Sequence, residues 1–457
     1  MKKFRIICWI GMLSGLSAGC AATPAPPPGP MADALVFTPN AGPVIQAAAS
    51  VSKDGMAEVM SLPDLVRLAL ERHPRLAEAS WAIEAARGQA LQAGLYPNPV
   101  LSINGNEISD RTGPAGIWSV FAGQEIVTGN KLRLSQAVAW RDVDQATLRV
   151  AVERFQVLTE VRQAYFEALT LQRRVEILRE LVTLAEQAVE NSRKLLEAKE
   201  AAELDVVQLE VDLERYRTDL EATARALPAA YRLLTAVAGA QDLTIGRLEG
   251  DLGAAVPTVD LEAARLLVLA THPELRVAEM AVERAQLVIV RAEAEPIPNV
   301  TVGAGYTYQG QNRSHDWDVG VSVPMPLWNR NQGAVLSARA QLSQAQAHVD
   351  QVRNELVHRL AGSFQAFVSA QRRSERYRSA ILPKAQRTYD LSRQAYQGGQ
   401  FEYLRVLEAQ RGLAETRLEL VRAQGEMWQA ASVLAGLMLD ESWPLPAPGT
   451  TSETQHP

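Results

Sequence analysis

The chain has 457 residues, with 46 Lys and Arg against 52 Asp and Glu, and a formal net charge of −6. Hydrophobic residues make up 47% and charged residues 21%, so the chain can bury a core and lacks the composition of a disordered protein. The negative charge argues against nucleic-acid binding through phosphate contacts. Cys8 and Cys20 are the two cysteines, which excludes a disulfide framework, a cysteine zinc site and a cysteine nucleophile in the rest of the chain.

The N-terminus has the pattern of an export signal. Basic residues within the first five positions precede an uncharged, mostly apolar stretch at 6–16 and small residues at 17–19. The small residues before Cys20 resemble a lipobox, which predicts a signal peptide at 1–19 and a lipidated Cys20; ordinary cleavage nearby without lipid is the alternative. Ala21 rather than Asp follows the cysteine, as in lipoproteins of the outer membrane. We therefore expect a lipid-anchored protein of the bacterial outer membrane that extends into the periplasm.

The most informative feature is an internal repeat at an offset of 199 residues. Matching positions include His73 and His272, Trp118 and Trp317, and Gln172 and Gln371. We therefore divide the mature chain into two copies of one unit, at 61–250 and 251–438. An Ala- and Pro-rich segment at 20–60 is expected to be extended, and residues 439–457 are expected to form a flexible tail.

Two short alternating runs occur in each unit, and they predict four strands at about 100–107, 117–126, 299–309 and 316–324. In the second unit, apolar and aromatic residues occupy one face, and Thr, Gly, Gln, Asp and Ser occupy the other. This two-residue alternation is typical of membrane strands that have one face in lipid and the other toward a watery lumen. A soluble two-faced sheet under the helices is the alternative. The side chains expected against lipid are Trp118, Val302, Tyr306, Tyr308, Trp317 and Val321.

Long helices follow the strands in each unit. No Gly or Pro occurs between Gly129 and Pro228, which strongly favours helix. Apolar residues recur there at spacings of three and four, a pattern shared by coiled coils and large helical bundles. The predicted helical hairpins cover about 130–227 and 329–437, with turns near 198–203 and 398–399. A helix of roughly 70 residues is about 100 Å long, much longer than a compact domain.

Together these elements predict an oligomeric tube. After the signal, no apolar run approaches the roughly 20 residues of a membrane-spanning helix, so any span has to be built from strands. One chain supplies four strands, which cannot close a barrel, and an open edge is not tolerated in lipid. The chain therefore has to oligomerise, with a dimer giving eight strands and a trimer twelve. Membrane strands joined to such long helices describe a tube that crosses a wide aqueous space.

The sequence resembles the TolC family of outer-membrane efflux channels over roughly residues 60–438. The resemblance rests on the duplicated strand-strand-helix-helix unit, on Pro-Met-Pro-Leu at 324–327, and on Tyr396-Gln-Gly-Gly followed by Tyr403-Leu404. Residues 124–132 are most similar to the Czc-type members of cobalt-zinc-cadmium efflux systems. The resemblance implies an α+β membrane protein, a homotrimer with a 12-stranded outer-membrane β-barrel continued by a long periplasmic α-helical barrel.

The resemblance also implies partners: outer-membrane lipid, a periplasmic adaptor (a membrane fusion protein) and an inner-membrane RND-type pump. The channel would be a passive exit duct for heavy-metal cations of the cobalt, zinc and cadmium type. Multidrug or other small-molecule export is the main alternative, because substrate choice in such assemblies lies largely in the pump. A periplasmic adaptor, which normally has one hairpin, and a structural coiled-coil lipoprotein, which lacks such strands, fit the two repeated strand pairs less well.

The helix turns lie about 100 Å from the strands and are candidates for a periplasmic gate. In the TolC family the matching region closes the channel through polar contacts of a tyrosine, an arginine and aspartates. Tyr396 and Glu408 match in type, whereas Phe401 stands where the arginine is expected and Arg405 where an aspartate is expected. Asp205 and Arg405 occupy equivalent places with opposite charge, and Arg405 can pair with Glu408 at i,i+3. The alternative is that these are ordinary exposed helix charges.

We find no pattern that indicates catalysis, a cofactor or a metal site. The six histidines are scattered without a His-x-x-x-His spacing: His73, His272, His315, His348, His358 and His456. No phosphate loop or Gly-x-Ser-x-Gly motif occurs. The first two histidines each precede a proline at the expected start of a helix, so we expect a structural role for them.

Overall fold

The computed structural model describes residues 58–108, 116–199, 202–400 and 403–442. All of them fall within one compact unit, Met56–Pro457. The signal peptide, Cys20, nearly all of the 20–60 segment and most of the C-terminal tail lie outside the described residues. The predictions made for those parts of the chain therefore stay predictions.

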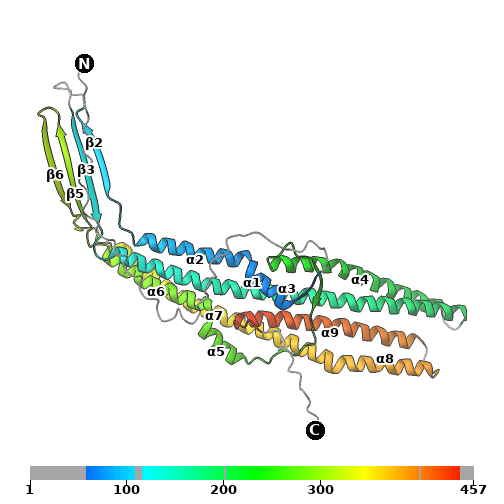
Figure 1. The fold of residues 1–457 in the computed structure, drawn as a ribbon. Helices are drawn as coiled ribbons and strands as arrows, with labels where there is room; N and C mark the ends of the chain where they lie inside the picture. Colours follow the sequence, from blue (N-terminus) through cyan, green and yellow to red (C-terminus); the bar gives the residue numbers. More distant parts are fainter. Residues whose placement is uncertain (1–57, 109–115, 200–201, 401–402, 443–457) are drawn as a thin grey trace, which may run out of the picture. The chain divides into compact units, whose positions relative to one another are not determined.

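The elements follow one another in the same order twice (Figure 1). The first set comprises β1 (Glu58–Ser61), α1 (Leu62–Arg72), α2 (Pro74–Ala93), β2 (Val100–Asn106), β3 (Ile117–Ile126), α3 (Lys131–Glu197) and α4 (Glu203–Val237). The second comprises β4 (Ile245–Glu249), α5 (Leu261–Thr271), α6 (Pro273–Ala294), β5 (Val300–Gln309), β6 (Ser314–Ser322), α7 (Gln332–Arg376), the π-helical turn η2 (Tyr377–Ile381), α8 (Leu382–Gln397) and α9 (Tyr403–Leu437). Each set contains a short strand, two helices, a strand pair and a long helical hairpin.

Two prolines behave differently from the sequence expectation. The first hairpin was expected to end at about residue 227, but α4 continues through Pro228 to Val237. Burial of Leu234 and Thr235 in its last turns offsets the hydrogen bond that the proline removes. The second hairpin is interrupted by η2, directly before Pro383 in the first turn of α8. A widened turn accommodates this proline, because its nitrogen cannot donate to the preceding turn.

The main sheet has four antiparallel strands in the order β2-β3-β5-β6. Val120 lies opposite Ile103 on one side and Tyr306 on the other, while Val319 lies opposite Ala304. Each outer strand, β2 and β6, has one neighbour and one unpaired edge within the described residues. A second, two-stranded sheet pairs β1 with β4 in parallel.

The main core lies where α3, α7 and α9 meet the short elements. Trp428 is almost completely buried, stacks on Phe166 with ring centroids 5.0 Å apart, and donates from Nε1 to the Leu252 carbonyl at 2.9 Å. Buried Gln172 accepts from the Leu248 amide at 2.8 Å and donates to the Leu248 carbonyl at 3.0 Å. The amide side chain thus holds β4 against α3 in the way a neighbouring strand would.

Glycines allow α3 and α9 to approach closely. A Cβ atom on Gly436 would lie 2.0 Å from the Thr159 hydroxyl, and one on Gly425 would lie 2.2 Å from the Thr170 hydroxyl. Both pairs are eleven residues apart on both helices, a spacing of three helical turns at about 3.67 residues each. The seam between these antiparallel helices therefore repeats every eleven residues.

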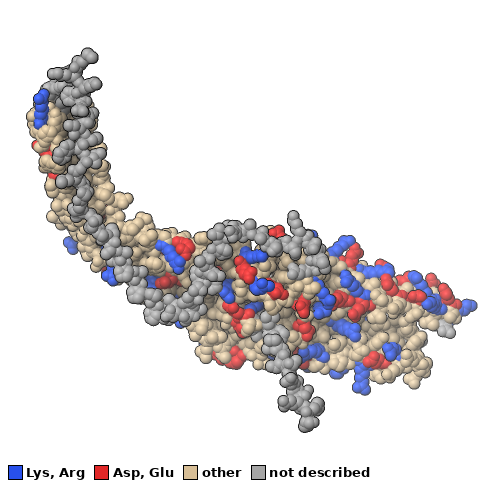
Figure 2. Space-filling view, in the orientation of Figure 1, with Lys and Arg blue, Asp and Glu red and all other residues tan. Residues whose placement is uncertain are grey.

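Charge separates the helices from the strands. On the face shown in Figure 2, the strands carry few Lys, Arg, Asp or Glu side chains, whereas both signs are interspersed over the helices. Interspersed charge of this kind is typical of helices exposed to water. α3 packs against α4 and α9, α2 lies on α3, and α6 contacts both α3 and α7.

Candidate functional site

The register of the sheet places the six expected lipid-facing side chains on one face. Cross-strand partners share a face, and the pairs are Trp118 with Tyr308, Tyr306 with Trp317, and Val302 with Val321. Val319 belongs to the same face and is 81% exposed. A sheet face with this much exposed apolar surface is typical of a site that contacts either lipid or another protein surface.

Aromatic rings gather on this face toward the β5–β6 turn. The ring of Tyr306 lies 5.2 Å from that of Trp317, and the ring of Tyr308 lies 5.2 Å from that of His315. The Tyr306 hydroxyl also hydrogen-bonds His315 Nδ1. Rings with one polar edge are typical of the boundary between lipid and water. His315, which the sequence presents as one scattered histidine, belongs to this cluster.

The opposite face is mainly polar near the same turn. Thr307 donates to Asp318 at 3.1 Å, and Gln309 donates to Asp316 at 2.8 Å. Phe121 is an exception that the sequence analysis missed: its ring lies over Gly303, where a Cβ atom would come within 2.2 Å of it. The aromatic ring thus covers the strand at the position that lacks a side chain.

The helix turns place the four candidate gate residues near the ends of their helices. Arg405 lies 3.6 Å from Glu408, and both side chains are exposed. The ring of Tyr396 lies 5.2 Å from that of Tyr403, across the α8–α9 turn. Asp205 accepts from the Ala202 amide at 3.4 Å and caps α4. Arg405 and Glu408 form an ion pair within α9, and no ion pair joins Asp205 to Arg405 in the described part of the chain.

An ion pair joins the two hairpins about two helical turns beyond the candidate gate residues, and the sequence analysis did not find it. Arg411 on α9 lies 3.6 Å from Asp212 on α4, whose side chain is mostly buried. Tyr216 packs beside it against Leu178, Leu181 and Ala414 of the α3–α9 seam. Burial chiefly, and then the Asp212 carboxylate, raises the pKa of Tyr216. One feature of the sequence could have indicated this pair: Asp212 and Arg411 have opposite charges and are separated by the repeat offset of 199.

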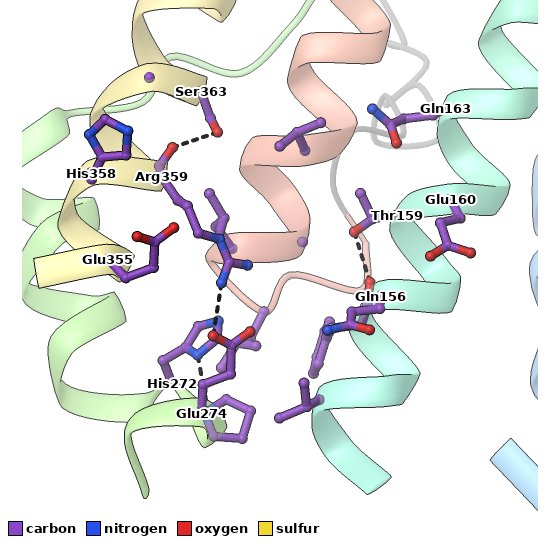
Figure 3. Close-up of a pocket in the computed structure, with 18 residues that line it drawn as sticks. Gln156, Thr159, Glu160, Gln163, His272, Glu274, Glu355, His358, Arg359 and Ser363 are labelled. Atoms are coloured by element: carbon purple, nitrogen blue, oxygen red, sulfur yellow. Dashed lines mark hydrogen bonds and ion pairs between the residues drawn. The ribbon is translucent and has the colours of Figure 1, made fainter. Parts of the chain in front are cut away.

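A cavity of about 630 Å³ lies between α3, α6, α7 and α9 (Figure 3). The side chains of His272 and Glu274 enter it from the start of α6, and Arg359 reaches Glu274 at 2.8 Å from α7. His272 Nδ1 accepts from the Glu274 amide at 3.3 Å and so caps α6, as His73 caps α2. Burial lowers the pKa of His272. Among the described residues, no cluster of three or more His, Cys, Asp or Glu side chains is arranged to hold a metal ion.

Equivalent ion pairs with exchanged charge fix the short helices to the long ones. At the start of α2, Arg75 contacts Glu160 of α3 at 2.9 Å and Glu153 at 2.8 Å. At the start of α6, Glu274 contacts Arg359 of α7. Hydrogen bonding to Glu160 chiefly raises the pKa of Arg75, so this guanidinium stays charged. Each pair lies at the repeat offset from the other with its signs reversed.

No helix among the described residues combines the length and hydrophobicity needed to cross a lipid bilayer. Over 377 residues the chain is 24% identical to the cobalt-zinc-cadmium resistance protein CzcC of Cupriavidus metallidurans, covering 82% of this chain and 89% of that protein. The fold is similar to that of CusC, with a TM-score of 0.70 and 20% identity over 82% of this chain and 91% of that one. It is also similar to the outer membrane protein VceC of Vibrio cholerae, with a TM-score of 0.69 and 20% identity over 82% and 95% of the two chains.

The model of the outer membrane efflux protein family matches residues 65–240 and 266–438, which together form most of the sequence. These segments contain both strand pairs and both helical hairpins. The family resemblance read from the sequence is confirmed: the chain belongs to the family of outer membrane efflux proteins.

Proposed function

We propose that three copies of this chain form the exit duct of a tripartite, RND-type efflux system. The observation that carries the proposal is the four-stranded sheet with one apolar face and two unpaired edges. Unpaired edges cannot persist in hydrocarbon, because their amide and carbonyl groups find no partner there. Three copies supply twelve strands for a closed barrel, whose polar inner face carries Thr307, Gln309, Asp316 and Asp318.

The helices extend this barrel into the periplasm. α3 has 67 residues and is about 100 Å long, so its far turn lies well beyond the outer membrane. A periplasmic adaptor and an inner-membrane RND pump would dock at this end. A lipid on Cys20 would tether the N-terminus to the same membrane. The chain acts as a passive duct in this assembly and has no enzymatic role.

Heavy-metal cations of the cobalt, zinc and cadmium type are the proposed substrates, and the similarity to a cobalt-zinc-cadmium resistance protein supports them. The test is a strain lacking this channel, grown with graded zinc, cobalt and cadmium or with antibiotics. We expect metal sensitivity that the wild-type chain restores, together with discrete conductance of the purified protein in planar bilayers and a native mass of three chains. If the strain is sensitive to antibiotics alone, the substrates are drugs and not metals. A soluble monomer without conductance would contradict the proposal that the chain forms a channel.

We further propose that the helix turns close the duct at rest. Tyr396, Arg405 and Glu408 lie at the α8–α9 turn, Asp205 holds the start of α4, and the Asp212–Arg411 pair ties the two hairpins together. The inter-hairpin pair is the better lock, because its aspartate is mostly buried, whereas exposed pairs within one helix contribute little.

The gate is tested by removing the inter-hairpin pair with Asp212→Ala and Arg411→Ala. We expect larger single-channel conductance and leakage of large antibiotics into cells, with an unchanged yield of trimers. The matched control is Glu419→Ala with Arg422→Ala, an exposed pair 4.0 Å apart within α9 itself. Wild-type conductance in the first variant would rule out this pair as part of the lock.

A further inference from the structure

The apolar face of the main sheet carries one ionisable side chain besides its tyrosines. The register assigns to this face the odd-numbered residues of β2 and β6 and the even-numbered residues of β3 and β5. Among these positions in the four described strands, His315 is the one His, Lys, Arg, Asp or Glu. The acidic residues of the same strands, Glu125, Asp316 and Asp318, lie on the opposite face. An ionisable group on a lipid-facing surface is costly, so His315 requires a partner there.

His315 lies at the outer end of the sheet. It is the second residue of β6 (Ser314–Ser322), directly after the β5–β6 turn, and the other end of each strand adjoins a helix (Figure 1). In the proposed channel the helices extend into the periplasm, so the β5–β6 turn faces the cell exterior. We therefore expect His315 at the level of the lipid headgroups in the outer leaflet, whereas Val319 lies near the middle of the strand.

Two tyrosines fix the ring of His315. The Tyr306 hydroxyl hydrogen-bonds Nδ1, and the Tyr308 ring lies 5.2 Å from the imidazole. With the hydroxyl as donor, the ring proton lies on Nε2, and a doubly protonated ring also carries a proton there. Nε2 has no hydrogen-bond partner within the described residues. The cluster thus holds a donor at the boundary between lipid and water that the described part of the chain does not satisfy.

A basic residue lies close to this donor. Arg313, two residues earlier in the turn, is exposed and forms no ion pair with a described residue. Figure 2 shows Lys or Arg atoms at this end of the strands. Asp316 lies on the opposite face, where it accepts from Gln309 at 2.8 Å. The outer end of the apolar face therefore has a free donor, a positive charge in the adjoining turn and, among the described strand residues, no carboxylate.

We propose that Tyr306, Tyr308, Arg313 and His315 form a binding site for a phosphorylated lipid of the outer leaflet. His315 Nε2 donates to a phosphate oxygen, and the Arg313 guanidinium supplies a second, charge-assisted donor. The aromatic rings contact the apolar part of the lipid next to the phosphate. This site rests on the proposed channel, which places the face in lipid, and it adds the lipid chemistry that the face selects. A trimer has three such sites.

A phosphate group matches these donors better than the other groups of a membrane lipid do. Phosphate oxygens are negatively charged acceptors, which both arginine and histidine bind through N–H groups. Acyl chains and sugar hydroxyls would leave the charge of Arg313 without a counter-ion. Free inorganic phosphate has no apolar part, so the rings of Tyr306 and Tyr308 would contribute nothing to its binding. The apolar surface around the donor therefore favours a phosphate that belongs to a lipid.

The opposite face of the same strand end has the reverse chemistry. Asp316 and Asp318 line the lumen side and accept hydrogen bonds from Gln309 and Thr307. Their carboxylates would repel a phosphate. The sheet thus separates donors on its lipid side from acceptors on its lumen side, so a phosphorylated lipid is expected to bind outside the barrel and not inside its mouth.

The test is binding of lipid A, a glycolipid with phosphate groups, to purified trimers of the full chain in detergent, measured by native mass spectrometry. His315→Phe keeps an aromatic ring and removes both nitrogens. It should weaken binding about tenfold to a hundredfold, the loss expected for one hydrogen bond to a charged group. His315→Arg keeps a donor for phosphate and should retain binding. The matched control is Val319→Phe, which adds a ring to the same face outside the cluster and should bind lipid A as the wild type does.

Two further probes identify the group that is recognised. Dephosphorylated lipid A should bind the wild type about tenfold more weakly than lipid A does, and inorganic phosphate should not displace lipid A. Equal binding of lipid A and its dephosphorylated form would overturn the recognition of phosphate. Full displacement by inorganic phosphate would overturn a lipid as its source.

Thermal dissociation of the trimers distinguishes lipid binding from a purely structural role of His315. A ligand that binds the assembled state stabilises it, so lipid A should raise the dissociation temperature of wild-type trimers. The rise should be smaller in His315→Phe. An equal rise in both proteins would overturn the lipid site, whatever their dissociation temperatures without lipid.

Failure of the lipid site and failure of the channel give different results on the same samples. Trimers that conduct and bind lipid A equally in every variant would overturn the site while the channel stands. A wild-type chain that is monomeric and does not conduct would overturn both.

Discussion

An arginine at Val319 tests the orientation of the sheet most directly. This side chain is 81% exposed on the apolar face of β6. The next residue, Gly320, points to the opposite face, and a Cβ atom there meets nothing within 4 Å. Val319→Arg therefore places a charge against lipid, whereas Gly320→Arg places it in the lumen, where water can solvate it. The two variants differ by one position and by one face.

The expected magnitude follows from the depth of the residue. β6 runs from Ser314 to Ser322 and has nine residues, so Val319 is one residue from its middle. An arginine on the lipid face near the bilayer midplane costs about 2–4 kcal/mol. Three copies in one barrel raise the cost to about 6–12 kcal/mol per trimer. A loss of this size is comparable to the whole stability of a typical domain, so little assembled protein should remain.

The assay is the yield of heat-modifiable trimers in outer-membrane fractions, with total protein as the reference. Val319→Arg should abolish trimers, and Gly320→Arg should retain them with altered conductance, because three added charges line the lumen. If Gly320→Arg loses more trimer than Val319→Arg, the assignment of the two faces is inverted. Equal, full retention in both would mean that this strand does not cross the membrane.

The remaining predictions concern packing, pH and the lipid anchor. Gly436→Ala should lower the midpoint of thermal unfolding, because its methyl group overlaps a threonine hydroxyl on α3 at a cost of about 1–3 kcal/mol. The control Gly412→Ala lies on the same helix, meets nothing within 4 Å and should raise the midpoint. Similar shifts in the two variants would contradict the close approach of α3 and α9. Burial lowers the pKa of His272, so the unfolded chain binds more protons and stability falls as the pH drops below about 6.5. His272→Asn can still cap α6, and it should reduce this loss of stability with falling pH by at most about 1.4 kcal/mol per pH unit, measured by thermal melts. The control is His348→Asn at an exposed position, which should leave the pH dependence of stability unchanged. If His272→Asn also leaves it unchanged, other groups cause the loss of stability. Cys20→Ala should abolish incorporation of labelled palmitate while trimers still insert, and equal labelling would show that Cys20 is not the acylated residue.

The strands could be located from the sequence because one face of each is apolar. The alternation at 299–309 anticipates β5 at Val300–Gln309, since a two-residue period has no other simple structural origin. Helix ends were harder to predict, because a proline ends a helix only when nothing else stabilises the next turns. Pro228 lies inside α4 because the residues after it are buried, and that burial depends on tertiary packing.

The site could be predicted where it depends on one strand or one helix, and not where it depends on two. The pair Arg405–Glu408 follows from helical spacing alone. The pair Asp212–Arg411 requires α4 and α9 to flank α3, and no local pattern in the sequence specifies that arrangement. Phe121 was missed for the same reason, since its position over Gly303 follows from the pairing of β3 with β5.

The exchanged ion pairs explain how two similar repeats can adopt distinct positions in one chain. If both short helices carried the same charge, the first turn of α2 and the first turn of α6 could each pair with either α3 or α7, because the repeats offer similar surfaces. Arg75 matches the acidic Glu160 on α3, and Glu274 matches Arg359 on α7. The wrong pairing would bring Arg75 to Arg359 and Glu274 to Glu160, and like charges at this partly buried site would repel each other. In a trimer, where six such short helices meet six long ones, this repulsion disfavours an ion-pair position on α7 for the start of α2, and the position of Glu160 on α3 for the start of α6, in every copy.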